Sequence, residues 1–210
     1  MDDDLLLKVL VVGDVAVGKT SIIQRYTNDS FRKDYKTTIG VEFALKPIEV
    51  DDKCVNIQLW DIAGQDRFIG LLRNFYRNAS AAIVVYDITS PKTLQNAVKW
   101  KADIDKKVRL PDGGIIPCIL LGNKSDLRET EGTTFIDPEY AMELAKKSGF
   151  IGCMETSAKT GANVGRACKG LVKKVITSMK NSQPAQTVVK DSNITLKGRS
   201  QKKADSSCCN

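Results

Sequence analysis

Alternating apolar runs predict an α/β fold with a parallel sheet covered by helices on both faces. Strand-like runs such as Leu5–Val12 and Val55–Trp60 alternate with stretches of helical periodicity. Several of these runs end in short polar strings that contain glycine. Ligands of parallel α/β sheets bind beyond the carboxyl ends of the strands, so these strings are expected to meet at one edge. The length of 210 residues suits one domain (1–180) followed by a tail (181–210).

The first apolar run, Leu5–Val12, leads into the string GDVAVGKT, which we call the phosphate loop. Its pattern, G-x-x-x-x-G-K-T, lets successive backbone N–H groups surround a phosphate. A helix expected to begin near Lys19 aims its positive end at the same anion. Lys19 is predicted to neutralise the β- and γ-phosphates, and Thr20 to give its hydroxyl to Mg²⁺. A plain glycine turn is the alternative, and eight matching positions argue against it. The phosphate-binding set is Gly13, Asp14, Val15, Ala16, Val17, Gly18, Lys19, Thr20 and Ser21.

The next motif, WDIAGQ, follows the strand-like run Val55–Trp60. The pattern D-x-x-G recurs by chance in turns, but it gains meaning after a phosphate loop and a strand. Asp61 is predicted to hold Mg²⁺ through water, and the Gly64 amide to contact the γ-phosphate. Gln65 is predicted to be the catalytic residue that orients the attacking water. Hydrolysis would remove the γ-phosphate contacts and let the loop relax.

Two further strings point to a guanine base. NKSD follows the apolar run Ile115–Gly122, and SAK follows the apolar region Phe150–Met154. A carboxylate at Asp126 can accept two hydrogen bonds from guanine N1 and N2, a donor pair that adenine lacks. NKSD alone would often be no more than a polar loop. Asn123 is predicted to contact the base and the loop, and the Lys124 stem to cover the ring. The Ala158 amide, in the loop Ser157–Lys159, is predicted to face guanine O6. Phe31 is predicted to stack edge-on against the base, although a position in the core is equally open for it.

Helical periodicity marks three further segments: Ser90–Lys107, Asp137–Ser148 and Ala162–Lys180. The last segment contains two glycines, which weaken a helix by about 1 kcal/mol each relative to alanine.

These motifs together resemble the Ras superfamily and, within it, the Rab GTPases, over roughly Leu5 to Lys180. The Rab-like strings are IGVEF, LWDIAGQDRF, FYRNA and VVYDIT, with a cysteine pair at Cys208 and Cys209. The resemblance implies a P-loop small GTPase (G domain) with a mainly parallel six-stranded sheet. It also implies a molecular switch that hydrolyses GTP to GDP and phosphate and regulates vesicle trafficking.

The same resemblance assigns roles that the motifs alone do not. Thr38 would complete the Mg²⁺ shell and touch the γ-phosphate, and Tyr35 would close over the nucleotide. Ile62, where most Rabs have Thr, and the stretch around Lys99–Pro117 resemble the subgroup of lysosome-related organelles and pathogen-containing vacuoles. The effector-binding residues would be Ile39 and the aromatic triad Phe43, Trp60 and Phe75, although three such aromatics are usually core residues.

Composition excludes several other chemistries. The chain has no histidine, which excludes His-based triads, general bases and metal sites. Its six cysteines form no zinc or disulfide pattern, and the first four are predicted to be buried thiols of a reducing compartment. The acidic start is unlike a signal peptide, and no apolar run approaches the ~20 residues needed to span a bilayer.

The tail is predicted to be a flexible tether that attaches the domain to a membrane. Five basic and two acidic residues give it a net charge of +3, out of +7 for the chain. No aromatics interleave with these charges, so anionic lipid is a better partner than nucleic acid. A CaaX box would need cysteine at position 207, which is Ser207. The pair Cys208 and Cys209 instead resembles the Rab terminus that carries two geranylgeranyl groups, and two lipids anchor stably.

The resemblance also implies partners and a location. The partners are GTP and GDP, an exchange factor, an activating protein, effectors, a GDP-dissociation inhibitor and a prenylation escort protein. The protein would be a monomer on the cytoplasmic face of endosomal, lysosome-related or vacuolar membranes, cycling through the cytosol.

One departure leaves a second function open. Val15 stands where many relatives have Gly or Ser, near the space that an arginine finger needs. Because such a finger contributes ~10³–10⁵ in rate, we expect slow intrinsic hydrolysis and a restricted choice of activating protein. A GTP-dependent scaffold that scarcely hydrolyses is therefore the alternative. A P-loop kinase or ATPase is a distant third, because NKSD and SAK select guanine.

Overall fold

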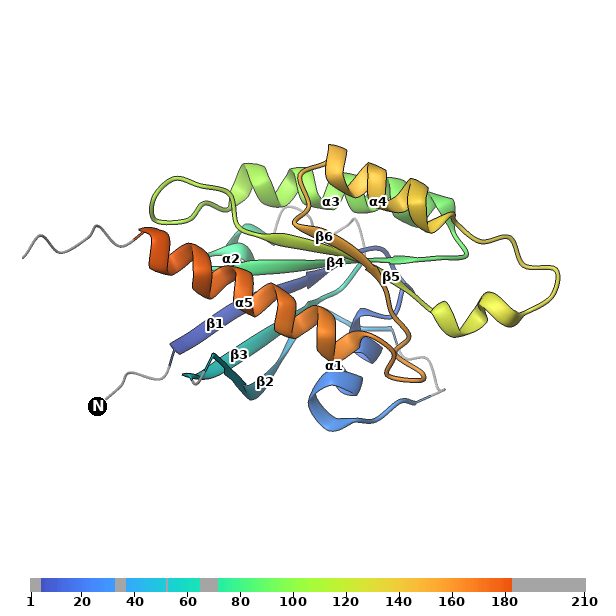
Figure 1. Ribbon diagram of the computed structural model, residues 1–210, viewed down its shortest axis with the longest axis horizontal. Coiled ribbons are helices and arrows are strands. Elements are labelled where there is room, and N and C mark those ends of the chain that lie inside the picture. Colours follow the sequence, from blue (N-terminus) through green and yellow to red (C-terminus); the bar gives the residue numbers. More distant parts are fainter. Residues whose placement is uncertain (1–4, 33–36, 52, 65–71, 183–210) are drawn as a thin grey trace, which may run out of the picture.

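The computed structural model describes residues 5–32, 37–51, 53–64 and 72–182. Its six-stranded sheet has the order β2-β3-β1-β4-β5-β6 (Figure 1). All neighbours are parallel except β2, which is antiparallel to β3, so the predicted mainly parallel sheet is confirmed. The strands are β1 (Leu5–Val12), β2 (Val41–Val50), β3 (Lys53–Ile62), β4 (Ala81–Asp87), β5 (Cys118–Asn123) and β6 (Gly152–Glu155). The helices are α1 (Lys19–Asn28), α2 (Leu72–Tyr76), α3 (Pro91–Lys107), the 3-10 helix η2 (Ser125–Glu129), α4 (Pro138–Lys147) and α5 (Val164–Ser182).

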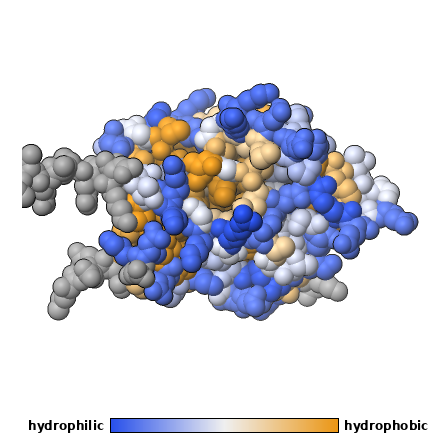
Figure 2. All heavy atoms as spheres, viewed as in Figure 1, coloured by the Kyte–Doolittle hydropathy of each residue, from blue (hydrophilic) through white to orange (hydrophobic). Residues whose placement is uncertain are grey.

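Helices cover both faces of the sheet, as the alternation of the sequence predicts (Figure 1). Ile22 of α1 and Leu171 of α5 belong to one buried apolar cluster. Leu94 of α3 and Ala141 of α4 belong to another on the opposite face. Polar and charged side chains cover much of the face seen in Figure 2, with apolar patches between them. The apolar stripes of α1, α3, α4 and α5 therefore pack on the sheet, and their polar sides face water.

The buried central strands bring the motifs to one edge of the sheet. All seven residues of β4 and all six of β5 are buried. Asp87, at the end of β4, is in register with Asn123 at the end of β5, and Val12 of β1 pairs with Val84. The phosphate loop and NKSD follow the ends of β1 and β5, so they lie near each other at this edge.

Several predicted boundaries differ from the observed ones by one or two residues, and the start of β5 differs by three. The strand Leu5–Val12 is β1, and α1 begins at Lys19. The strand expected from Ile115, however, begins at Cys118. Pro117 has no N–H to give to the ladder, although its carbonyl accepts a hydrogen bond from the Ala82 N–H at 3.0 Å. Ile115 therefore belongs to the preceding loop and is 45% exposed.

The prediction of four buried thiols is wrong for one cysteine. Cys118 and Cys168 are buried and Cys153 is half-buried, but Cys54 is exposed. Cys54 pairs with Glu49 close to the turn between β2 and β3, and it lies on the face of β3 opposite to that of the buried Val55. Burial raises the pKa of Cys118 and of Cys168 to about 12, so both thiols stay protonated.

No helix in the described part of the chain is long and apolar enough to cross a bilayer. The tail and its cysteine pair lie outside the described residues. The boundary predicted at residue 180 falls inside the last turn of α5, which ends at Ser182.

Candidate functional site

A cavity of about 570 Å³ lies at the sheet edge where the motifs meet. Its walls come from the phosphate loop, α1, the segment around Thr38, and the loops after β3, β5 and β6. Most of the described residues that the motifs select line it. These are Val15, Ala16, Gly18, Lys19, Thr20, Ser21, Phe31, Thr38, Gly64, Asn123, Lys124, Asp126, Ala158 and Lys159. The cavity is thus large enough for a nucleotide-sized ligand.

Lys19 is the buried cation of the cavity. Its ammonium donates to the carbonyl oxygens of Gly13 at 2.9 Å and Asp14 at 2.8 Å, so the phosphate loop wraps around it. Burial lowers the pKa of Lys19 to about 8, and the negative charges of Asp61 and Asp14 only partly oppose this. A buried ammonium with few counter-charges favours an anion beside it, as the prediction of a phosphate partner requires.

Hydroxyl and carboxylate oxygens gather at the other side of Lys19. The Thr20 and Thr38 hydroxyl oxygens are 2.7 Å apart, and the Thr20 hydroxyl donates to Asp61 Oδ2. Asp61 Oδ1 is buried and has no hydrogen-bond partner among the described residues. Burial raises the pKa of Asp61, against the effect of its hydrogen bond from Thr20 and of the Lys19 charge. These three oxygen donors suit a hard cation.

Asn123 joins the phosphate loop to the loop Ser157–Lys159. Its side-chain Nδ2 donates to the Val17 carbonyl at 2.9 Å, and its Oδ1 accepts from the Ala158 N–H at 3.1 Å. A Cβ on Gly18 would lie 2.2 Å from Asn123 Nδ2, so a glycine is required there. Gly18 also has φ +96°, in the left-handed region. The two loops are therefore fixed relative to each other by one buried amide.

The Ala158 N–H was predicted to face guanine O6, and here it is already engaged with Asn123. Contact with O6 would have to share or displace this hydrogen bond. The sequence pattern could not reveal this competition, because the two residues lie 35 positions apart.

The carboxylate of Asp126 lies where the loops after β5 and β6 line the cavity. Its Oδ1 accepts from the Ser157 hydroxyl at 2.6 Å, and Lys159 Nζ is 3.5 Å from its Oδ2. Lys124 Nζ lies 2.6 Å from Asp87 Oδ2, which holds the Lys124 stem along the loop. Although burial opposes it, hydrogen bonds from Lys124 and Thr89 lower the pKa of Asp87. The carboxylate of Asp126 is thus oriented before any base arrives.

Some predicted residues stand behind the cavity wall. Val17 is a core residue that contributes its carbonyl, and Ser157 is fully buried. Phe31 is compatible with both predicted roles, contact with the base and a position in the core, since it lines the cavity and also packs against the core. Gly64 sits directly on the phosphate loop, because a Cβ there would lie 2.5 Å from the Gly13 carbonyl oxygen. Gln65 and Tyr35 lie outside the described residues.

The predicted aromatic triad lies on β2, β3 and α2, outside the cavity. The ring centroids of Phe43 and Trp60 are 5.7 Å apart, and those of Trp60 and Phe75 are 6.3 Å apart. Phe43 is 59% exposed and Ile39 is 86% exposed, whereas Trp60 and Phe75 pack partly against the core. The triad therefore has both core and surface character.

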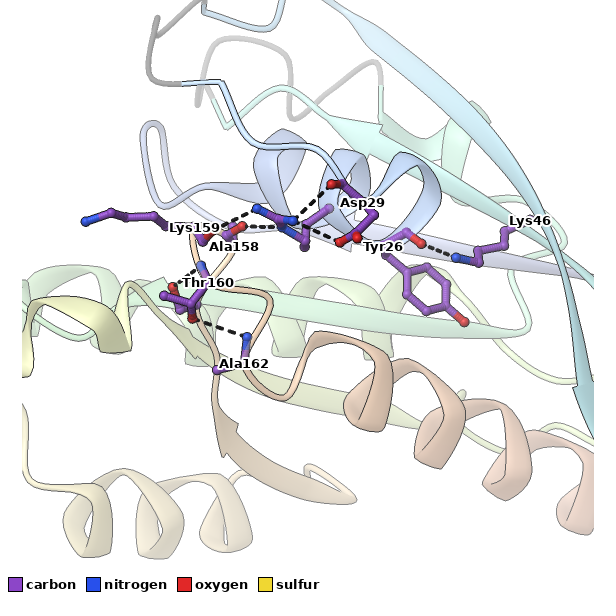
Figure 3. Close-up of polar contacts among 9 residues, drawn as sticks. Tyr26, Asp29, Lys46, Ala158, Lys159, Thr160 and Ala162 are labelled. Atoms are coloured by element: carbon purple, nitrogen blue, oxygen red, sulfur yellow. Dashed lines mark hydrogen bonds and ion pairs between the residues drawn. The ribbon is translucent and has the colours of Figure 1, made fainter.

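Two contacts made by the site were missed by the sequence motifs. The Asp14 carboxylate turns toward α3, where it accepts from Asn96 Nδ2 at 2.7 Å and from Trp100 Nε1 at 3.1 Å. Arg25 of α1 donates to the carbonyls of Ala158 and Lys159 in the loop Ser157–Lys159; Figure 3 labels these two acceptor residues. Both contacts link residues more than 80 positions apart, and no local pattern signals them.

The fold and the cavity together define a P-loop nucleotide-binding domain. A sequence model of the Ras family matches residues 8–177. The chain is 47% identical over 180 residues to Ras-related protein Rab-7L1 of Homo sapiens, covering 85% of each chain. It is 41% identical over 208 residues to Ras-related protein Rab-32 of Homo sapiens, covering 97% of this chain and 89% of that one. Ras-related protein Rab-32B of Dictyostelium discoideum is 42% identical over 206 residues, with 97% and 77% covered.

The chain therefore belongs to the Ras family, as a small GTPase of the Rab type. It binds guanine nucleotides and hydrolyses GTP, and a role in vesicle trafficking fits this family. Like the family in general, it works through regulators and effectors.

The depressed pKa of Lys19 predicts how nucleotide affinity depends on pH. In the nucleotide-free protein, Lys19 loses its proton as the pH rises through about 8. Phosphates favour the protonated form, so the Kd for GDP should rise above this pH, by up to about tenfold per pH unit. Titration of nucleotide-free protein with GDP between pH 7 and 9.5 measures this effect.

The matched control is Lys19→Gln, which should bind more weakly and show no such rise. A wild-type affinity that stays constant over the whole range would contradict the assignment of Lys19.

Proposed function

We propose that this GTPase is a Mg²⁺-dependent timed switch, in which GTP orders switch I (about 31–40) and switch II (about 62–77). The observation that carries the proposal is the position of Thr38. Its hydroxyl oxygen lies 2.7 Å from that of Thr20, beside the buried carboxylate of Asp61. A residue of switch I is thus already held against the phosphate loop. Loss of the γ-phosphate would remove a contact that holds Thr38 in this position and would release bound effectors.

The three oxygen donors Thr20, Thr38 and Asp61 are proposed to hold Mg²⁺. Thr20 and Thr38 would offer hydroxyl oxygens, and Asp61 would act through water. The raised pKa of Asp61 and its unpartnered Oδ1 support a nearby cation. When bound, Mg²⁺ would neutralise charge on the β- and γ-phosphate oxygens. Among the described residues, no three His, Cys, Asp or Glu side chains gather as an independent metal site.

The other roles follow from the chemistry of each group. Lys19 would pair with the β- and γ-phosphates, and Asp126 would read guanine N1 and N2. Gly64 would offer its amide to the γ-phosphate from its position on the phosphate loop. Gln65 would orient the attacking water, and Tyr35 would close over the nucleotide. The residues of the phosphate loop would contribute mainly backbone N–H groups.

The side chain of Val15 is proposed to slow GTP hydrolysis by crowding the cavity. Its side chain is 43% exposed and lines the cavity, so it occupies space beside the phosphates. An activating protein that inserts an arginine would meet this β-branched side chain. This crowding favours a second candidate function, a scaffold that stays bound to GTP and to its effectors.

The exposed apolar residues beside switch I are proposed to bind effectors. Ile39 and Phe43 are largely exposed, and the rings of Phe43, Trp60 and Phe75 form a continuous row. Exposed aromatic clusters often mark partner sites in soluble proteins. GTP-dependent placement of the neighbouring switches would make this surface sensitive to the nucleotide.

The tail is proposed to anchor the domain to intracellular membranes. Geranylgeranyl groups on Cys208 and Cys209 would anchor stably where one would bind only marginally. Its basic residues would add about 1 kcal/mol each near anionic lipid. An escort protein would present the chain for prenylation, and a GDP-dissociation inhibitor would carry it through the cytosol. Relatives named Rab-32 and Rab-7L1 and the subgroup resemblance favour endosomal, lysosome-related or vacuolar membranes.

Single-turnover hydrolysis tests the switch against the scaffold. The full chain is loaded with Mg·GTP, and GTP and GDP are separated by chromatography over time. Slow conversion is expected in the wild type, with a rate about tenfold or more lower in Gln65→Leu because the water loses its orienting group. Val15→Gly should hydrolyse faster than the wild type. No conversion in any of the three would support the scaffold, and equal rates in all three would refute the roles of Gln65 and Val15.

Intact-mass analysis of the protein recovered from cells tests the lipid anchor. The expected mass includes two geranylgeranyl groups, and the double variant Cys208→Ser, Cys209→Ser should carry none. A wild-type mass with neither adduct would overturn the anchor while leaving the nucleotide site untouched.

A further inference from the structure

Arg25 connects helix α1 to the loop Ser157–Lys159, which we call the guanine loop. Its Nε donates to the Ala158 carbonyl at 2.9 Å, and its Nη2 donates to the Lys159 carbonyl at 2.7 Å (Figure 3). One planar guanidinium therefore holds two successive carbonyls of the loop. This forked geometry fixes an orientation, which a single point contact would not do.

The same side chain also reaches the end of its own helix. Arg25 Nη1 donates to the Asp29 carbonyl at 3.0 Å and to Asp29 Oδ1 at 2.8 Å. Asp29 caps α1 with φ 48°, and its N–H returns a hydrogen bond to the Arg25 carbonyl. On the other side of this helix end, Lys46 of β2 donates to the Tyr26 carbonyl and lies 4.6 Å from the Tyr26 ring centroid (Figure 3). The end of α1, from which Arg25 reaches the loop, is therefore held both by its contacts with Asp29 and by Lys46 of β2.

Burial indicates which of these contacts matters. The Asp29 side chain is 92% exposed, so its ion pair with Arg25 is screened by water and contributes little. The Arg25 side chain is only 17% exposed. Hydrogen bonds from a charged donor to backbone carbonyls are stronger than neutral ones, and the carbonyl of the buried Ala158 has less access to water.

In the guanine loop, both backbone polar groups of Ala158 are hydrogen-bonded. Ala158 gives its N–H to Asn123 and receives the Arg25 guanidinium on its carbonyl. Beside it, the Ser157 hydroxyl donates to Asp126. Gly161 lets the chain turn past the arginine, since its φ is +84° and a Cβ there would lie 3.5 Å from Arg25 Cδ. Release of the arginine would leave the loop held from the Asn123 side only.

We propose that Arg25 is a positioning residue for the guanine ring, which slows nucleotide release by fixing the guanine loop from the side of α1. This inference rests on the proposed role of that loop in binding the base. Arg25 itself does not line the cavity, and it acts through the loop's backbone. Its effect should therefore appear in retention of the base.

The dissociation rate of a fluorescent GDP analogue, chased with excess GDP in Mg²⁺, tests the proposal on the full chain. In Arg25→Ala the rate should rise about tenfold or more, because two charge-assisted hydrogen bonds to the loop are lost. Arg25→Lys keeps the charge and the aliphatic stem but not the fork, and its rate should fall between those of the wild type and Arg25→Ala. This second variant also keeps the test decisive if Arg25→Ala does not fold.

Two matched controls separate the carbonyl contacts from charge. Asp29→Asn removes the negative charge of the exposed ion pair, keeps a side chain that tolerates the left-handed φ of 48° and leaves both carbonyl bonds available, and Arg166→Ala removes an exposed arginine from α5. Both should release GDP within about twofold of the wild-type rate, as expected for exposed charges.

Base selectivity separates positioning from general loosening of the domain. 6-Thioguanosine diphosphate differs from GDP only at position 6, where sulfur is a weak hydrogen-bond acceptor. The wild type should hold GDP more tightly than this analogue, and Arg25→Ala should reduce that preference. A merely structural defect would speed the release of both nucleotides equally.

A wild-type dissociation rate in both Arg25 variants would overturn the inference, as would equal acceleration by Asp29→Asn. An unchanged preference for GDP over the thio analogue in Arg25→Ala would also overturn it. If the wild type bound no guanine nucleotide, the proposed assignment of the base loop would fail instead, so the two failures are distinguishable.

Discussion

The arrangement of the whole site depends on the buried side-chain amide of Asn123. It is the last residue of β5, a strand with all six residues buried, so its position is fixed by the core. Its two polar atoms bind the Val17 carbonyl on one side and the Ala158 N–H on the other. A buried amide without these partners would be costly, so neither loop can move away alone. The close approach of Gly18 to the same amide adds a steric limit to this link.

Two buried charged groups beside the cavity, Lys19 and Asp61, would be stabilised by ligand groups of opposite charge. Lys19 is a buried cation whose pKa is depressed, and Asp61 is a buried carboxylate whose pKa is raised. Each is therefore in an environment that disfavours its charged form. A nucleotide with Mg²⁺ would bring a negative group to Lys19 and a positive one to Asp61. The protein holds these groups in place, and the ligand supplies the missing counter-charges.

Local sequence patterns predicted those parts that depend on neighbouring residues. The boundaries of β1 and the start of α1 follow directly from an apolar run and from the phosphate loop. The cavity contains most of the described motif residues, because each motif follows a strand of one parallel sheet. The start of β5 was displaced, because Pro117 cannot donate to the ladder. The exposure of Cys54 depends on which face of β3 its side chain occupies, which composition does not reveal.

Long-range contacts account for what the patterns missed. Arg25 reaches the guanine loop across more than 130 positions, and Asn96 and Trp100 reach Asp14 across more than 80. Such partners are chosen by the packing of α1 and α3 on the sheet. The engagement of the Ala158 N–H with Asn123 has the same origin.

Asn123 thus couples the phosphate loop and the guanine loop into one guanine-nucleotide site. The most direct test is the nucleotide content of the purified full chain, measured by chromatography after denaturation, for the wild type and Asn123→Ala. We expect about one equivalent of GDP or GTP and no adenine nucleotide in the wild type. The variant should retain little or no nucleotide, because a buried amide and two loop contacts are lost. Full retention of guanine nucleotide by Asn123→Ala, or adenine nucleotide in the wild type, would contradict it.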